Sequence, residues 1–415
     1  MQRRDFVRAC ALSGLSLALP GSHLRALDHE LVPYDGRFLI VLLAGGGWDP
    51  SMVADPRGSV NRTFGEGDIL TAGNIRYAPI EGAQRFFERH YQRMVVVNGI
   101  NFATGSHEAG VRYCSSGHLG TGHPTLAAVF AASKRPELPL AYLTFGGYEN
   151  DEGVVPPIRN LNAFLLEDVA NPELQWGREP YHSVSARALI DRARGAALRE
   201  RAERSGLPRY RQSAENLVRV RAGVRELRRL QDALPTLHEA EHKRQAQIGL
   251  AGYRAGIGVA LNLAAPGIFD SHGDHDRVHT EALTGLYDYL EFIWNEAERQ
   301  GVADRIDLVI TSDFGRTPHY DSEADGNGKG HWPIGSIIVV SSSLPRPNRV
   351  VGATDEGLNA IPIDPATLAP STVEAGGVEL TPEHVHENIR RWLGVDGSIV
   401  SRRFPLRPSA DVDLF

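Results

Sequence analysis

Short apolar runs separated by longer amphipathic stretches dominate the hydrophobic pattern of the chain. Five runs rich in Val, Ile and Leu predict buried strands, at residues 38–43, 94–97, 140–145, 308–311 and 337–340. Stretches of helical period lie between several of them, at residues 82–93, 125–133 and 280–300. Because strands and helices alternate, the pattern predicts an α/β fold, with a doubly wound, mostly parallel sheet that helices cover on both faces.

The segment from about residue 186 to 254 has a different pattern. It is rich in Arg, Glu, Ala and Leu, and only Gly206-Leu207-Pro208 interrupts it. This predicts two or three amphipathic helices, and their irregular heptads favour a helical insertion over a coiled coil for a partner. The Pro-, Gly- and Thr-rich residues 350–377 predict a loop, and Thr381-Pro382-Glu383 predicts the start of a final helix that runs through Trp392. We therefore expect one domain over residues 27–415.

The N-terminal residues have the pattern of a removable export signal. Arg3 and Arg4 precede a mildly apolar stretch, 9–19, which Pro20 ends. A membrane-spanning helix would need roughly 20 apolar residues, so no transmembrane span is expected in the mature chain. The paired arginines favour a twin-arginine signal over residues 1–26, cleaved after Ala26, with the twin-arginine translocase as the partner during export. The mature protein is then expected to be periplasmic or secreted.

Composition and charge narrow the possible partners. The chain has a formal net charge of -7, and 42% of its residues are hydrophobic and 23% charged, as in a water-soluble globular protein. No excess of Lys and Arg is present to replace phosphate counterions, which excludes a nucleic-acid partner. Cys10 leaves with the signal, so Cys114 is the only cysteine of the mature chain and no intrachain disulfide can form.

The first candidate site residue follows the first predicted strand. The sequence Ala44-Gly45-Gly46-Gly47-Trp48-Asp49 lets the backbone turn tightly and places Asp49 at the rim of the sheet, where open parallel sheets bind ligands. A phosphate-binding loop is disfavoured, because the GxGxxG spacing and a following Lys-Ser or Lys-Thr are absent.

The densest cluster of possible ligands is residues 270–276, Asp-Ser-His-Gly-Asp-His-Asp. Carboxylate oxygens and imidazole nitrogens are the donors that Zn²⁺, Mn²⁺ or Fe²⁺ take. We expect Asp270, His272 and His275 to be metal ligands. The alternative is a turn with a capped helix start, in which Asp276 caps the next helix.

Two more candidates flank the predicted strands at 308–311 and 337–340. Asp313 follows the first of them, in Ser312-Asp313-Phe314-Gly315-Arg316, and His331 precedes the second, in Gly-His-Trp-Pro. A lone His before Trp-Pro is commonly a turn residue. Here it would lie at the same sheet edge as Asp313, which favours metal ligation by both.

In this order the motifs resemble those of the alkaline phosphatase superfamily. More closely, the Gly-Gly-Gly-Trp-Asp loop, Phe-Asp-Ser-His, Phe-Gly-Arg-Thr-Pro and Gly-His-Trp-Pro are similar to the exported sulfatase-like family called domain of unknown function 1501. The resemblance implies an alkaline-phosphatase-like fold and a hydroxyl nucleophile near Thr104 or Ser106. Ser106 could equally cap the helix that follows it, and His107, His118 and His123 are further candidate ligands.

The departures from the superfamily pattern bear on the number of metals. Phe314 stands where the superfamily has a His ligand, and the sulfatase pattern Cys-x-Pro-Ser-Arg is absent. A second metal centre would therefore be weak or empty, and about one ion per chain is expected.

The resemblance implies metal-assisted hydrolysis of a phosphate or sulfate ester, with a small anionic ester or a sulfated or phosphorylated glycan as substrate. Asp270, His272 and His331 would hold one divalent ion, with Zn²⁺ expected and Mn²⁺ or Ca²⁺ as alternatives. Asp49 and Asp313 would form the weaker site. Arg316 would stabilise the anionic ester as a forked donor. Two rivals remain. One is a non-catalytic metal-binding scaffold of the cell envelope that recognises a glycan or protein partner. The other is oxidative chemistry at a mononuclear iron site.

Overall fold

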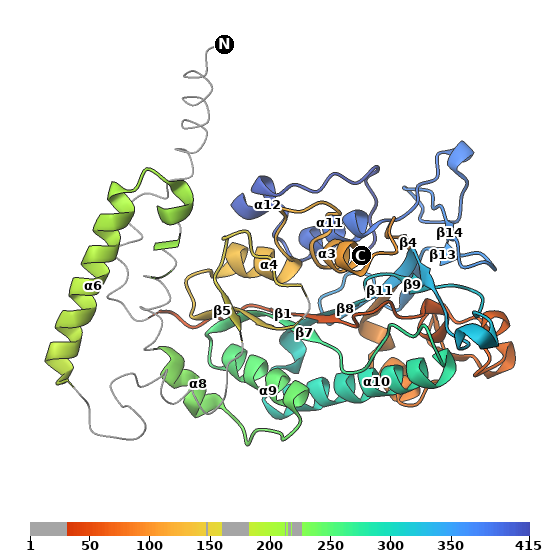
Figure 1. Cartoon of the computed structure of the whole chain (residues 1–415), viewed down its shortest axis with the longest axis horizontal. Coiled ribbons are helices and arrows are strands. Elements are labelled where there is room, and N and C mark those ends of the chain that lie inside the picture. The colour runs from red at the N-terminus through yellow and green to blue at the C-terminus, as the bar shows by residue number, and fades with distance from the viewer. Residues whose placement is uncertain (1–30, 147, 160–181, 212, 215–216, 218–225) are drawn as a thin grey trace, which may run out of the picture.

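A single eight-stranded sheet organises the protein (Figure 1). The computed structural model describes residues 31–146, 148–159, 182–211, 213–214, 217 and 226–415. The strands of the sheet are β1 (Phe38–Leu43), β4 (Met94–Asn101), β5 (Leu140–Phe145), β6 (Pro157–Arg159), β7 (Gly258–Ala264), β8 (Ile306–Thr311), β11 (Ile334–Ser341) and β12 (Arg349–Val351). The predicted signal, 1–26, lies outside the described residues.

The sheet is mostly parallel, which confirms the predicted fold class. Its strand order is β12-β4-β11-β8-β1-β7-β5-β6. Only β11 runs antiparallel to its two neighbours, β4 and β8, and the remaining neighbours pair in parallel. All five predicted strands are present, and β7 is an additional one. Its sequence, Gly-Val-Ala-Leu-Asn-Leu-Ala, follows an Ala- and Leu-rich stretch, where periodicity alone does not separate a short strand from a buried helix.

Helices cover both faces of the sheet (Figure 1). One layer contains α3 (His107–Ser116), α4 (Leu126–Lys134), α11 (Pro382–Trp392) and α12 (Ile399–Arg403); the other contains α2 (Ala83–His90), α8 (Arg228–Ala233), α9 (Glu241–Arg254) and α10 (His275–Arg299). Side chains alternate along β1, so that Ile40 and Leu42 belong to one core cluster and Leu39 and Val41 to the other.

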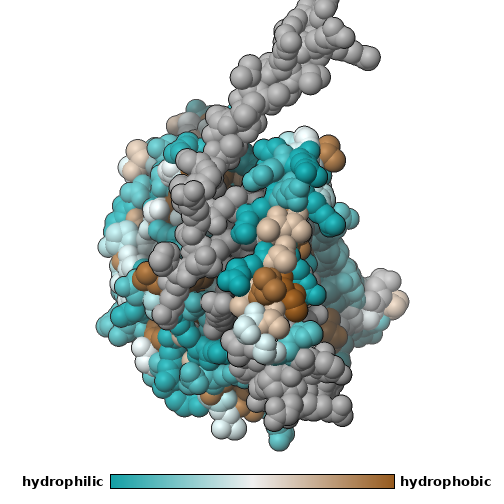
Figure 2. All heavy atoms as spheres, turned by 90° about the vertical axis from the view of Figure 1, so that its left-hand side faces the viewer, coloured by the Kyte–Doolittle hydropathy of each residue, from teal (hydrophilic) through white to brown (hydrophobic). Residues whose placement is uncertain are grey.

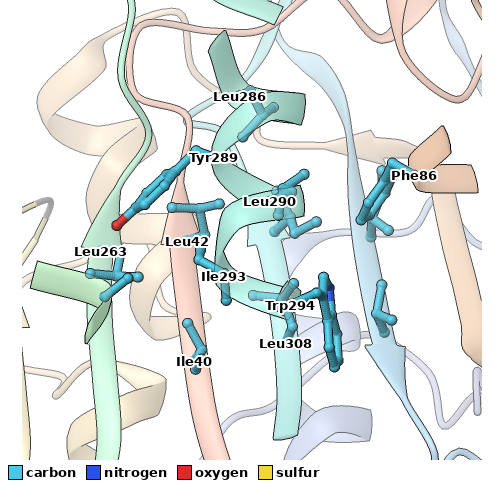
Figure 3. Packing of buried hydrophobic residues seen from close by; sticks show 14 of the residues in the cluster. Ile40, Leu42, Phe86, Leu263, Leu286, Tyr289, Leu290, Ile293, Trp294 and Leu308 are labelled. Atoms are coloured by element: carbon cyan, nitrogen blue, oxygen red, sulfur yellow. The ribbon is translucent and has the colours of Figure 1, made fainter. Parts of the chain in front are cut away.

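Helix α10 shows how one layer is held on the sheet. Leu286, Leu290, Ile293 and Trp294 recur at helical spacing and are at most 1% exposed. Figure 3 shows them facing the strand residues of the same cluster. The helix begins at His275, five residues earlier than the pattern predicted. Backbone bonds from Asp274 N and His275 N to the carbonyls of Gly326 and Asn327 fix this early start.

Within residues 186–254, the predicted insertion, the described residues include three helices, with non-helical residues at 205–207 and 234–240. Helix α6 (Val184–Arg204) stands apart at the left of Figure 1 and ends before Gly206, and Figure 2 shows the molecule from that side. Helices α8 and α9 follow, and parts of the insertion between residues 212 and 225 lie outside the described residues. Among the described helices, none has both the length and the apolar character needed to cross a membrane.

The C-terminal region differs from the sequence expectation in two details. Residues 350–377, predicted as loop, include the last two residues of β12 and the paired two-residue strands β13 (Ala353–Thr354) and β14 (Ala360–Ile361). Helix α11 spans the predicted residues with Thr381 at its N-cap, but the short helix α12 follows it.

The direction of the strands determines where a site can form. Because β1, β4, β7 and β8 run the same way, their carboxyl ends meet at one edge of the sheet. The antiparallel strand β11 begins at that edge, and the hairpin-like pair β9 (Gly315–Arg316) and β10 (His331–Trp332) lies beside it. The loops that carry the candidate ligands therefore converge there.

Candidate metal centre

Three side chains from distant parts of the chain meet at this edge. They are His107 at the start of α3, Asp270 after β7, and His331 in β10, and one ligand atom from each lies within 4.8 Å of the others. Asp270 Oδ1 is 3.4 Å from His107 Nε2 and 3.2 Å from His331 Nε2.

The tautomer of His107 is fixed by a carboxylate. His107 Nδ1 lies 2.5 Å from Asp313 Oδ2, while Asp313 Oδ1 accepts from the backbone N–H groups of Gly46 and Gly47 at 2.9 and 2.6 Å. Asp313 thus takes the Nδ1 proton as a hydrogen bond and leaves a lone pair on His107 Nε2. That nitrogen is buried and has no hydrogen-bond partner among the described residues. A histidine whose outer nitrogen bonds a carboxylate is the usual arrangement at a metal site.

The tautomer of His331 is fixed in the same sense by the backbone. Its Nδ1 donates to the carbonyl oxygen of Gly105 at 2.6 Å, so its Nε2 also carries a lone pair. That nitrogen lies 2.8 Å from His272 Nε2. His272 is half exposed, and its Nε2 lies 3.0 Å from Asp270 Oδ1, next to the three clustered ligands.

Asp270 is held in its ionised form. Burial raises the pKa of its carboxyl, but the Arg316 guanidinium, which donates to it, outweighs burial and lowers the pKa to about 2. Arg316 Nη2 donates to Asp270 Oδ1 at 2.7 Å. The loop around Asp270 packs closely on Gly46, where a Cβ would lie 2.6 Å from Asp270 N and the backbone has a φ of +115°. Only glycine fits there.

Arg316 is fully buried and bonded within the protein. Its Nε donates to Gly47 O at 2.8 Å, its Nη1 to Lys329 O at 3.1 Å, and its Nη2 to Gly46 O as well as to Asp270. The sequence analysis assigned it to the anionic ester. In the structure its guanidinium joins the glycine loop to Asp270.

Phe314 forms the apolar floor of the cluster. It is fully buried, and its ring centre lies 4.8 Å from that of His107 and 4.6 Å from that of His331. A Cβ at Gly47 would lie 2.7 Å from this ring. Phe314 therefore packs beside the histidines without offering a donor.

Asp49 lies in a different environment from the His107 cluster. It is fully buried; its Oδ2 is 2.7 Å from Lys329 Nζ and 3.3 Å from His275 Nε2, and its Oδ1 accepts from Ser51 N at 2.9 Å. Burial raises the pKa of Asp49, yet the ammonium of Lys329 beside it brings the pKa well below the usual value. The expected second site, Asp49 with Asp313, therefore has both carboxylates occupied by protein donors.

Two buried histidines of α10 support this region. Asp49 N donates to His279 Nε2 at 2.8 Å, and burial lowers the pKa of His279 well below its usual value, so that ring is neutral and donates from Nδ1. The acceptor is Ser271 Oγ at 3.1 Å, which also lies 2.7 Å from His275 Nδ1. His275 therefore faces Asp49 and Ser271, while His272, three residues earlier, faces the cluster.

The two candidate nucleophiles lie beside His107. Ser106 occupies the N-cap position of α3, is exposed, and makes no side-chain capping bond. Thr104 Oγ1 accepts from Ser106 N at 3.0 Å. His118 and His123 stack on each other with ring centres 3.7 Å apart, beyond the other end of α3.

The geometry of the cluster can be compared with that of a bound ion. Metal–nitrogen distances of about 2.0–2.1 Å in a tetrahedral site separate the ligand atoms by about 3.4 Å. The separations of 3.4 and 3.2 Å around Asp270 Oδ1 are close to this value. His272 Nε2 lies nearer, at 2.8 Å from His331 Nε2 and 3.0 Å from Asp270 Oδ1, so it would have to move away from both to become a fourth ligand. The donor set and the unpartnered Nε2 of His107 fit one divalent metal.

Sequence reasoning missed several supporting residues. His279 was not considered, Lys329 was considered only as positive charge in place of a missing ion, and His107 was only one of three further candidate histidines. The i,i+4 spacing of His275 and His279 was a readable signal, since it places both rings on one face of a helix.

The structure is that of an α/β protein with a mostly parallel sheet, at whose carboxyl edge two histidines and one aspartate gather in an arrangement that could hold a metal ion. A family model described as "Protein of unknown function (DUF1501)" matches residues 39–396. The chain belongs to this family, as its motifs predicted. Among curated proteins, none matches the sequence.

Several solved structures are similar to the chain. One is the lipoteichoic acid synthase LtaP from Listeria monocytogenes, with 9% identity over 94% of this chain and 80% of that chain and a TM-score of 0.36. A 2-O GAG sulfatase has 9% identity over 91% and 76%, with a TM-score of 0.34. The phosphonate monoester hydrolase of Agrobacterium radiobacter has 14% identity over 91% and 79%, with a TM-score of 0.29. Similarity at this level does not extend to activity.

Proposed function

We propose that the chain binds one divalent metal ion through His107, Asp270 and His331, with His272 as a fourth, exchangeable ligand, and uses it to hydrolyse a phosphate or sulfate ester. The observation that carries the proposal is the pair of fixed tautomers. Asp313 and the Gly105 carbonyl hold the Nδ1 protons of His107 and His331, so that both Nε2 lone pairs face Asp270.

The donor set favours particular ions. Two or three imidazole nitrogens and one carboxylate suit Zn²⁺, Mn²⁺ or Fe²⁺, whereas Ca²⁺ prefers six or more oxygen ligands. A bound ion of this kind supplies Lewis-acid polarisation of an ester oxygen and lowers the pKa of a bound hydroxyl or water. Zn²⁺ is the expected ion.

The residues of the chain have distinct parts in this proposal. Asp270 and His272 are the most exposed members of the site, so an anionic ester or a charged glycan approaches from their side. Ser106 or Thr104 supplies the hydroxyl nucleophile. Ser106 is favoured by the exposed N-terminus of α3, whose backbone N–H groups stabilise a developing alkoxide. Asp313 and Arg316 are positioning residues for His107 and Asp270.

A second candidate function is a metal-binding scaffold of the cell envelope without catalysis. The observation that favours it is the burial of Arg316 and Lys329, since neither cation faces an ester at the surface. Measurable hydrolysis of an ester distinguishes the hydrolase from the non-catalytic scaffold. Iron instead of zinc in the purified protein would favour the third candidate, oxidative chemistry, because two histidines and one carboxylate are also the ligands of non-haem iron.

The test is elemental analysis of protein purified from the periplasm, combined with hydrolysis of 4-nitrophenyl phosphate and sulfate before and after chelation. His107→Ala and His331→Ala should each remove most of the metal and the hydrolysis. The control is His182→Ala, an exposed histidine remote in sequence from every ligand. Wild-type metal content in both site variants contradicts the proposed centre. Metal without hydrolysis of any ester supports the scaffold.

A further inference from the structure

The most heavily buried charge pair next to the proposed centre has no part in the function described so far. Lys329 and Asp49 are both fully buried, and Lys329 Nζ lies 2.7 Å from Asp49 Oδ2. The ammonium also donates to Asn61 Oδ1 at 3.3 Å and lies 4.9 Å from the centre of the Tyr320 ring. A lysine is rarely buried so completely unless its charge is matched.

The groups around this ammonium form a set of metal-type donors. Asp49 contributes a carboxylate oxygen and Asn61 an amide oxygen. His275 contributes Nε2, which is buried, 3.3 Å from Asp49 Oδ2, and without a hydrogen-bond partner among the described residues. Carboxylate, amide and imidazole donors around one buried point are what a divalent cation would use. The cation found there is the side chain of Lys329.

We propose that Lys329 fills, with its ammonium, a cation site formed by Asp49, Asn61 and His275, and thereby limits the chain to one exchangeable metal ion. The inference rests on the proposed function for the ion at His107, Asp270 and His331, but the cation site at Lys329 is a separate one. It also gives a structural reason for the weak or empty second site that the sequence predicted.

The backbone of Lys329 is held by hydrogen bonds at both its N–H and its carbonyl group. Its backbone N–H donates to Ser271 O at 3.1 Å, and its carbonyl accepts from Arg316 Nη1 at 3.1 Å. Asp49 is held in turn by Ser51 N and by its own N–H on His279. Because these bonds belong to the fold, the ammonium cannot leave as an ion does, and a chelator cannot remove this charge.

The segment that carries Lys329 also carries a proposed ligand. Lys329 lies two residues before His331, and its carbonyl bonds the same Arg316 that holds Asp270. A fixed cation here therefore anchors the two loops that supply Asp270 and His331. Through these contacts the ammonium of Lys329 supplies a permanent positive charge beside the proposed metal centre, and this charge does not exchange with ions in solution.

The experiment measures the number of bound ions in the full chain by elemental analysis after saturation with Zn²⁺ or Mn²⁺. Wild type should hold about one ion, and Lys329→Ala, which frees the donors and the space, should hold about two. Lys329→Met, which fills the space without charge, should stay at about one. Asp49→Asn in the Lys329→Ala background should return to about one. Lys243→Ala, which removes a partly buried lysine paired with Asp288, is the control for loss of a lysine.

A folded Lys329→Ala protein that holds no more metal than wild type overturns the inference. If this variant is unfolded without metal, Zn²⁺ or Mn²⁺ should restore its folding, because an ion then replaces the missing charge; absence of rescue also overturns it. The first ion is assessed separately with His331→Ala. Wild type with no ion refutes the proposed function, whereas a gain of one ion in Lys329→Ala still supports the cation site.

Discussion

His331 lies directly opposite Arg316 in the antiparallel pair of β9 and β10, and both side chains contact the same oxygen of Asp270. The proposed ligand His331 and Arg316, which orients the neighbouring ligand Asp270, are therefore positioned by the same pair of two-residue strands. The backbone pairing leaves little freedom to either side chain, which is how a rigid scaffold positions a metal centre.

Arg316→Met tests this relationship. The variant removes the bond to Asp270 Oδ1 and leaves the carbonyls of Gly46, Gly47 and Lys329 without their donors. Loss of a supporting hydrogen bond commonly weakens metal binding by about 10–100-fold, and we expect that range here. Competition with a chelator measures it. Arg277→Met, which removes an exposed arginine paired with Asp274 and Glu281, should leave the affinity unchanged.

Asp313→Asn tests whether Asp313 orients His107 as a metal ligand without being a ligand itself. An amide can still accept from Gly46 and Gly47 through oxygen, but its NH₂ group then faces His107 Nδ1. The ring would have to accept at Nδ1 and carry its proton on Nε2, which removes the lone pair aimed at the ion.

We therefore expect Asp313→Asn to lower metal affinity by about 10–100-fold while the apo protein stays folded. Isothermal titration with Zn²⁺ and circular dichroism measure the two properties. Asp364→Asn, at a partly exposed turn that lies outside the cluster, is the matched control. Unchanged affinity in Asp313→Asn would mean that His107 is not a ligand.

The location of the site could be predicted from the sequence, because it depends on local patterns. Apolar runs of strand length followed by Asp49 or Asp313 place these carboxylates at the carboxyl edge of a parallel sheet, and the structure has them there. Residues 270–276 could be predicted to contain metal ligands, because carboxylate and imidazole side chains are concentrated there.

The division between ligands and supporting residues could not be predicted, because it depends on contacts between residues far apart in the chain. His107 and Asp313 are 206 positions apart, and Lys329 and Asp49 are 280 apart. His272 and His275 illustrate the same limit. The start of α10 buries one ring against Ser271 and leaves the other half exposed at the cluster, and no local pattern separates them.

Export is tested at Arg3 and Arg4, which lie outside the described residues. Replacing both by Lys retains the charge but removes the arginine pair that the twin-arginine route requires. The variant should accumulate in the cytoplasm, as measured by cell fractionation. Equal amounts of wild type and variant in the periplasmic fraction would exclude this route.

Acid stability depends on a buried histidine away from the centre. Burial lowers the pKa of His386 to about 4, although its Nε2 donates to Cys114 O at 2.8 Å. The unfolded chain takes up a proton near pH 6.5 while the folded one does not, so stability is lost as pH falls from about 6.5 to about 4.

The shift corresponds to about 3 kcal/mol of unfolding free energy, lost over that pH interval. His386→Phe should flatten this part of the profile, as measured by denaturant unfolding at pH 7 and pH 4.5. His182→Phe, at an exposed position, should keep the wild-type slope. A wild-type slope in His386→Phe would assign the acid sensitivity to other groups.

The last prediction concerns Phe314→His and involves both the His107 cluster and the cation site that Lys329 fills. Considered from the sequence, Phe314→His should restore a missing ligand and add a second ion. The structure changes this expectation. The ring of Phe314 packs against those of both His107 and His331, whereas the second cation locus is filled by Lys329.

Phe314→His alone should therefore leave the stoichiometry at about one ion and tighten its binding, because an additional imidazole then adjoins the first site. Lys329→Ala, alone or combined with Phe314→His, should reach about two ions, because the second ion enters the locus that the ammonium of Lys329 fills. Elemental analysis gives the count, and hydrolysis of 4-nitrophenyl phosphate reports whether the second ion raises turnover. Phe102→His, at another fully buried aromatic position, controls for the insertion of a polar ring into the core. Two tightly bound ions in the single variant Phe314→His would show that Lys329 does not limit the metal content.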